Sequence, residues 1–291
     1  MYKTSALHTF QIGTLKSLGY ESRVTLVNNS MRCPQWAGPV IVDVTVHSVG
    51  KPVHYLKHLV EIPLGGRAII ECSQLEAVAK SSDNQSVVFH LIPKTLYGQE
   101  ECNMDRASIW SLLTAQDHYV EYYLPNGYAA GVLYQSGSFN YEQFSQERTT
   151  LIQAPKVYTS QNLSTYLMLI NNGFDEGYQV TAVMDCVLVD SHGKTFAKWE
   201  ETIAPFQVKL INLSEKKPLQ LHSLENDLSF STFYGLCRNA TLLPLTITKN
   251  GESNDLAVEH SLPPNYYAGG FTGPVRKRGI IDLGRTQVFG N

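Results

Sequence analysis

The sequence lacks the features that mark several common classes of protein. Its five cysteines are odd in number and include no CxxC pair, so neither a disulfide framework nor a zinc site is indicated. The N-terminus has no apolar stretch of signal-peptide length, and no run approaches the roughly 20 apolar residues of a membrane span. We therefore expect a cytoplasmic protein with reduced thiols and no membrane span.

The chain also has little charge of either sign. Charged residues make up 17% of the sequence and the formal net charge is -3, so no basic field is present to hold phosphate backbones. This composition argues against a nucleic-acid partner. The 16 tyrosines and 11 phenylalanines suit β-sheets better than helices, and we expect an ordered, mostly β protein.

Motifs for catalysis and for phosphate binding are missing as well. Gly65-Gly66 and Gly269-Gly270 do not join a strand to a helix with a following Lys-Ser/Thr, so neither is a phosphate loop. Ser261 has no G-x-S-x-G context, so it is not indicated as a hydrolase nucleophile. The sequence predicts no catalytic residues, no cofactor and no metal.

What the sequence does contain is a twelve-residue pattern that occurs twice, at residues 120–131 and 258–269. Both copies read V-E-x-x-L-P-x-x-Y-x-A-G, and their glutamates, Glu121 and Glu259, are 259 − 121 = 138 residues apart. Identity at proline, tyrosine and glycine positions is unusual by chance. The pattern predicts an internally duplicated chain.

Alternating strands and turns recur at similar offsets. The strand that ends at Asn28 matches the strand that ends at Asn171, an offset of 143, and Ile62 before its proline corner matches Ile203, an offset of 141. We predict an all-β chain of two tandem antiparallel β-sandwich domains related by internal duplication. Residues 1–150 form the first domain with a connecting arm, and residues 151–291 form the second with a C-terminal arm. A short helix is expected at Gln74 to Lys80.

The repeated pattern supplies the candidate functional residues. Glu121 and Glu259 could form a paired-carboxylate site, but we favour a structural role in which each accepts backbone N–H bonds from its own loop. His260 is a metal ligand or base only if further ligands exist, so a hydrogen-bonded structural role is favoured. The tyrosines could line a ligand groove or pack over the end of a sheet. The candidate binding or structural residues are Glu121, Tyr128, Glu259, His260, Tyr266 and Tyr267.

About half of each repeat resembles a known family of small β domains, and the residues that carry the resemblance are given for the second copy. The resemblance lies in Leu167-x-Leu169-Ile170-Asn171, the strand from Val180 to Val189, and Ile203-x-Pro205 leading to Leu210-x-x-Leu213. This order is similar to the small bacterial β-sandwich modules typified by the sensory-rhodopsin transducer family. The resemblance implies a cytoplasmic, oligomeric, non-catalytic binding or signalling module.

The sequence thus favours a non-enzymatic interaction or scaffold protein. One alternative is a small-molecule or carbohydrate-binding protein that uses tyrosine-lined loops, and a second is a carboxylate-dependent hydrolase. We expect a homo-oligomer with an unknown protein or small-molecule partner. In that oligomer, the apolar residues of Gly279 to Asn291 pack against a neighbouring domain or subunit.

Overall fold

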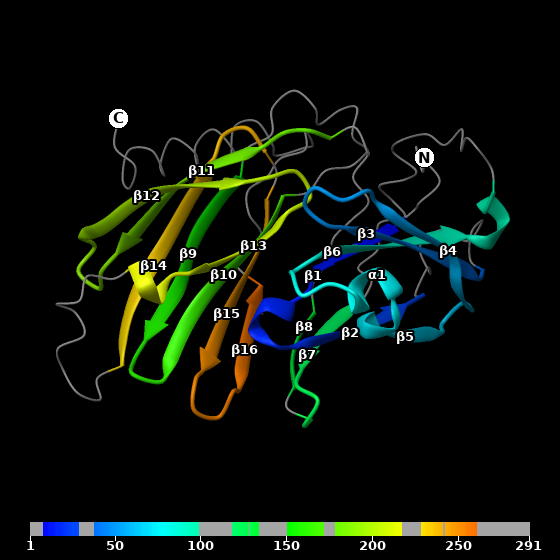
Figure 1. The fold of residues 1–291 in the computed structure, drawn as a ribbon, viewed down its shortest axis with the longest axis horizontal. Helices are drawn as coiled ribbons and strands as arrows, with labels where there is room; N and C mark the ends of the chain where they lie inside the picture. The colour runs from blue at the N-terminus through cyan, green and yellow to red at the C-terminus, as the bar shows by residue number, and fades with distance from the viewer. Residues whose placement is uncertain are drawn as a thin grey trace. The chain divides into compact units, whose positions relative to one another are not determined.

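The computed structural model describes residues 8–28, 38–98, 118–127, 129–133, 150–171, 178–216, 228–240 and 242–260. Strands make up most of this part of the chain (Figure 1). The strands are β1 (His8–Gly13), β2 (Glu21–Val27), β3 (Val40–His47), β4 (His54–Ile62), β5 (Arg67–Glu71), β6 (Ser86–Pro93), β7 (Tyr119–Tyr123), β8 (Ala129–Leu133), β9 (Thr150–Thr159), β10 (Leu163–Asn171), β11 (Ala182–Val189), β12 (Thr195–Ile203), β13 (Val208–Asn212), β14 (Ser229–Cys237), β15 (Leu242–Asn250) and β16 (Leu256–His260).

The helical segments among the described residues are all short. The single α-helix, α1 (Glu76–Ala79), lies within the segment predicted to be helical. The 3₁₀ turns are η1 (Lys16–Leu18), η3 (Cys72–Gln74), η4 (Lys94–Leu96) and η6 (Ser214–Lys216). None of the described helices is long and apolar enough to cross a membrane.

The strands form four antiparallel sheets in two compact units. Unit 1 contains β1 to β8, arranged as sheet A (β1-β6-β3-β4) and sheet B (β5-β2-β7-β8). Unit 2 contains β9 to β16, arranged as sheet C (β12-β11-β14-β9) and sheet D (β13-β10-β15-β16). Each strand of unit 2 therefore takes the place of the strand eight positions earlier in unit 1. The predicted fold class, all-β with tandem antiparallel sandwiches, is confirmed, whereas a common origin of the two halves stays a prediction.

Alternation of side chains builds the core of each sandwich. In β2 the buried positions Ser22, Val24 and Leu26 alternate with half-buried ones, as expected for a strand with one face on the core. In β7 the inward residues are Val120 and Tyr122, and the Tyr122 hydroxyl donates a 2.8 Å bond to the carbonyl of Gly13 in β1. This bond ties sheet B to sheet A inside unit 1.

The same buried asparagine closes one corner of each sandwich. The Asn28 side-chain amide donates to the carbonyls of Gly38 and Ile62, at 2.9 and 3.1 Å. In unit 2 the Asn171 amide donates to the carbonyl of Ile203 at 3.0 Å, and also to those of Val180 and Ala204. The offset of 143 predicted from these two asparagines therefore joins structurally matching positions.

The twelve-residue pattern, by contrast, does not occupy matching positions. Val24 pairs with Val120 in unit 1, and its counterpart Leu167 pairs with Thr246 in unit 2, so the offset here is 246 − 120 = 126 rather than 138. The first copy forms the β7–β8 hairpin, whereas the second begins in the edge strand β16. The expectation that Glu121 and Glu259 are equivalent is wrong. The pattern falls on the inner strand β7 in unit 1 and on the edge strand β16 in unit 2.

Candidate functional site

A network of polar and aromatic side chains lies on the outer face of sheet B. Side chains that alternate with the core residues of β2, β5 and β7 point to this face. Strand register places Glu71, Arg23 and Glu121 in one row across three strands, and Ile69, Thr25 and Tyr119 in the next row. We call this surface the Arg23 face, and it comprises Arg23, Thr25, Ile69, Glu71, Tyr119, Glu121 and Tyr123.

Arg23 is the centre of the face and contacts both neighbouring strands. Its Nε donates to Glu121 Oε2 at 2.8 Å, and its guanidinium lies 3.6 Å from Glu71 Oε1. The guanidinium carbon also lies 5.5 Å from the centre of the Tyr123 ring, within reach of a cation–π interaction. The hydrogen bond to Glu121 raises the pKa of Arg23, so the guanidinium stays protonated and positively charged.

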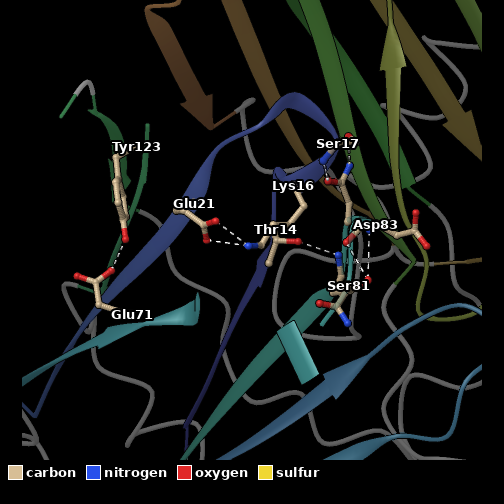
Figure 2. Close-up of polar contacts among 10 residues, drawn as sticks. Thr14, Lys16, Ser17, Glu21, Glu71, Ser81, Asp83 and Tyr123 are labelled. Atoms are coloured by element: carbon tan, nitrogen blue, oxygen red, sulfur yellow. Dashed lines mark hydrogen bonds and ion pairs between the residues drawn. The ribbon is translucent and has the colours of Figure 1, made fainter. Parts of the chain in front are cut away.

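Tyr123 completes the network as a hydrogen-bond donor. Its hydroxyl donates to Glu71 Oε2 at 2.7 Å, as the dashed line in Figure 2 shows. Burial of the ring, together with the bond to Glu71, raises the pKa of Tyr123 to about 12, so the phenol is neutral at physiological pH. One cation, two carboxylates and one phenol are thus held in fixed orientation on a surface that remains partly exposed to solvent.

Tyr119 is held on the same face by a glycine of the repeated pattern. A Cβ atom built on Gly131 would lie 1.6 Å from the Tyr119 hydroxyl and 2.1 Å from the adjacent ring carbon. The ring therefore crosses the backbone of β8 at a position where only glycine leaves room. This contact gives a physical reason for the final glycine of the first pattern copy.

Of the predicted site residues that the structure describes, Glu121 is the one that lies on the Arg23 face. Its carboxylate accepts a hydrogen bond from Arg23 Nε. The expected bonds from the N–H groups of its own loop, which includes Tyr128 outside the described residues, stay a prediction. Glu259 and His260 lie in edge strand β16 of unit 2, where Glu259 is exposed and pairs with Thr246 in the backbone ladder. Tyr128, Tyr266 and Tyr267 lie outside the described residues, so their predicted roles stay predictions.

Unit 2 does not repeat the Arg23 network. Register places Tyr166 where unit 1 has Arg23, with Asn212 in place of Glu71 and Ile247 in place of Glu121. Ile247 is fully buried, so this part of sheet D is covered rather than open. The two units share a strand order but present different chemistry at this position.

A second polar cluster in unit 1 was missed by the sequence reasoning. Asp43 is 1% exposed in the middle of β3, and its Oδ1 accepts bonds from the His58 backbone N–H at 2.6 Å and from the Tyr97 hydroxyl at 3.1 Å. Opposite Asp43 the ladder passes from Val60 directly to Leu56, which leaves a β-bulge at 57–59. The sequence feature that could have revealed this cluster is Asp43 itself, a single acidic residue inside an apolar strand.

The bulge turns the backbone N–H of His58 toward the buried carboxylate of Asp43. His58 has φ 54, a left-handed conformation that is uncommon for residues other than glycine, and this local strain is offset by the bond to Asp43. Across the ladder from Asp43 lies His90, whose ring bonds the Thr45 hydroxyl at 3.0 Å. Burial lowers the pKa of His90 to about 4, although the charge of Asp43 opposes this shift.

The described cysteines are buried and free. Cys72, Cys186 and Cys237 form no disulfide, and burial raises the pKa of each thiol. In this environment the three thiols act as small apolar core residues. Among the residues that the structure describes, no three His, Cys, Asp or Glu side chains are grouped so that they could hold a metal ion.

No known protein-family profile and no curated protein sequence matches the chain. Among solved structures it is similar to a glycosyl hydrolase family 2 member from Bacteroides cellulosilyticus DSM 14838, with a TM-score of 0.22 and 10% identity over 86% of this chain and 27% of that one. A β-glucuronidase from glycoside hydrolase family 2 gives a TM-score of 0.20 at 10% identity, over 86% and 23% of the two chains. The Bacteroides uniformis β-glucuronidase gives 0.19 at 9% identity, over 89% and 26%.

The chain thus spans about a quarter of the length of these structures. Similarity at such low TM-scores carries no argument about function, and the predicted resemblance to transducer modules stays a prediction. What is established is a pair of antiparallel β-sandwich units, one of which carries the Arg23 face.

Proposed function

We propose that this protein is a non-enzymatic interaction protein in which the two sandwich units form the scaffold and the Arg23 face is the binding surface. One observation supports the proposal above the others. On a solvent-facing sheet, Arg23 is fixed by Glu121 and Glu71 and lies against the Tyr123 ring. A side chain that is already ordered loses little conformational entropy when a partner binds it.

The composition of the face favours a protein partner. Tyrosine and arginine are the residue types that contribute most to the energy of protein interfaces, especially when apolar contacts surround them. Ile69 supplies such a contact, since 59% of this large apolar residue is exposed next to Thr25 and Tyr119. The open face of a sheet suits another folded surface better than it suits an enclosed small molecule.

An oligosaccharide is a second candidate ligand, and the Tyr119 geometry favours it. The ring lies over Gly131 with no intervening side chain, so it is a fixed aromatic platform beside the carboxylate of Glu121. Sugar rings stack their apolar faces on such aromatic side chains, while carboxylate and guanidinium groups bond the hydroxyls.

Site-specific crosslinking in the cell of origin tests the proposal. A photoreactive benzoylphenylalanine replaces Thr25, which lies on the face in the row next to Arg23, and the matched control replaces Val183, a half-exposed residue on sheet C. We expect the probe at position 25 to capture a defined protein that the probe at 183 does not. Arg23→Ala in the same chain should reduce capture about tenfold, the effect of a contact worth about 1.4 kcal/mol.

The same variants distinguish a protein partner from an oligosaccharide ligand. If the ligand is an oligosaccharide, no protein is captured, a glycan array gives a signal, and Arg23→Ala removes it. Identical capture from positions 25 and 183, together with a blank glycan array, contradicts the proposal that the Arg23 face is a binding surface.

A further inference from the structure

The edge strand beside the Arg23 face has backbone hydrogen-bonding groups that no described residue uses. β5 is the first strand of sheet B, and among the described strands it pairs with β2 alone. In an antiparallel ladder, alternate residues direct both backbone groups to one neighbour. The Asn28 N–H donates to the carbonyl of Gly66, so Ala68 and Ile70 continue the ladder with β2.

Arg67, Ile69 and Glu71 consequently direct their N–H and C=O groups away from β2. No backbone hydrogen bond of the described residues uses these outward groups. The strand has no bulge in its pairing with β2 and no residue with positive φ, so it is straight enough to pair on its free side. Exposed, regular edge strands are templates for the addition of another strand.

The sequence of β5 is complementary to itself when reversed. It reads Arg-Ala-Ile-Ile-Glu, so two copies that run antiparallel and are centred on Ile69 place Arg67 of one opposite Glu71 of the other. Both ends of the pairing then carry opposite charges, and the two exposed isoleucines face each other at the centre. The centre is a hydrogen-bonded pair, because the outward groups of Ile69 meet there.

We propose that β5 pairs antiparallel with β5 of a second copy of this chain across a twofold axis. The pairing joins the two B sheets into one eight-stranded sheet, with every outward backbone group of Arg67, Ile69 and Glu71 satisfied. It also places the two Arg23 faces on one continuous surface. A twofold contact of this kind uses the same residues on both copies, so it closes as a dimer and does not extend into a fibre.

The corresponding strand of unit 2 is not suited to this contact. β13 reads Val-Lys-Leu-Ile-Asn, and reversal brings no opposite charges together. Its Lys209 is already bound to Glu201 at 2.6 Å and to the carbonyl of Thr202 at 2.9 Å. A lysine on an edge strand is a common means of preventing strand addition. The proposed dimer therefore forms through unit 1.

Sedimentation velocity of the full chain over a hundredfold range of concentration tests the proposal. We expect the unaltered protein to reach the mass of a dimer. Ile69→Lys places two positive charges opposite each other at the twofold axis and should leave a monomer at every concentration. Phe230→Lys, at a residue of similar exposure on β14, is the matched control and should remain dimeric.

A disulfide at the twofold axis provides an independent measurement. In a hydrogen-bonded antiparallel pair the two Cα atoms are about 5.5 Å apart, within the roughly 4.4–6.8 Å that a disulfide spans. Ile69→Cys should therefore form a covalent dimer under mild oxidation, whereas Leu64→Cys and the unaltered chain should not. A monomeric unaltered protein, a dimer that survives Ile69→Lys, or an Ile69→Cys variant that stays uncrosslinked would each overturn the proposal. None of these outcomes depends on the ligand of the Arg23 face.

Discussion

Replacing Asn171 with alanine should destabilise unit 2 strongly. The side chain is fully buried at the corner of the sandwich. Its Nδ2 donates to the carbonyls of Val180, Ile203 and Ala204 at 2.8, 3.0 and 3.1 Å, and its Oδ1 accepts a 2.8 Å bond from the Tyr178 hydroxyl. Alanine removes all of these bonds and leaves the groups that they satisfied inside the protein.

The expected loss follows from the number of groups left without a partner. An amide has two N–H donors, so its three carbonyl contacts count as two hydrogen bonds, and the tyrosine hydroxyl adds a third. At about 1 kcal/mol for each bond, with a further penalty for the buried hydroxyl, Asn171→Ala should cost about 3 to 4 kcal/mol. Asn28 makes two such bonds in unit 1, so Asn28→Ala should cost about 2 kcal/mol.

Hydrogen exchange measured by mass spectrometry reports on each unit separately. The opening free energy of the slowest amides in β10 gives the effect of Asn171→Ala, and that of β2 gives the effect of Asn28→Ala. The control is Asn162→Ala, at an exposed residue whose amide bonds Glu252 at 3.0 Å. A loss at Asn171 no larger than the loss at Asn162 would refute the corner role of the buried amide.

Three further predictions follow from other contacts. Gly131→Ala should displace the Tyr119 ring and weaken binding at the Arg23 face while leaving the core intact, which a crystal structure with a binding assay would check. The folded pKa of His90 is about 4, against about 6.5 in an unfolded chain, so the unfolded state binds the proton first and stability falls as the pH drops through this window. His90→Gln should make the free energy of unfolding less dependent on pH in this window, as urea titrations at several pH values would show. An unchanged pH dependence contradicts the assignment of this effect to His90. Asp43→Asn should weaken the hydrogen bond from the His58 N–H, because a neutral amide oxygen replaces a carboxylate, and should increase hydrogen exchange at the β4 bulge. Unchanged exchange at the bulge would contradict a role of the Asp43 carboxylate in holding the left-handed conformation of His58.

The fold class was determined by sequence features that act locally. Alternating apolar residues in a segment such as Arg23 to Asn28 bury one face of a strand whatever its neighbours are, so the all-β class followed from local pattern. The offset of 143 also held at Asn28 and Asn171, because each asparagine must satisfy the same corner carbonyls.

The tertiary structure decided which residues lie together. Identity between the two pattern copies suggested that Glu121 and Glu259 match, but strand register separates them, because a sheet position depends on hydrogen-bonding neighbours and not on local sequence. Arg23 and Glu71 gave no signal, since each is an ordinary charged residue until β2 lies between β5 and β7. Local patterns predicted strands such as β2 and β3, together with the inward face of β2. The Arg23 face, the bulge around Asp43 and the free edge of β5 arise from long-range pairing, which no local pattern encodes.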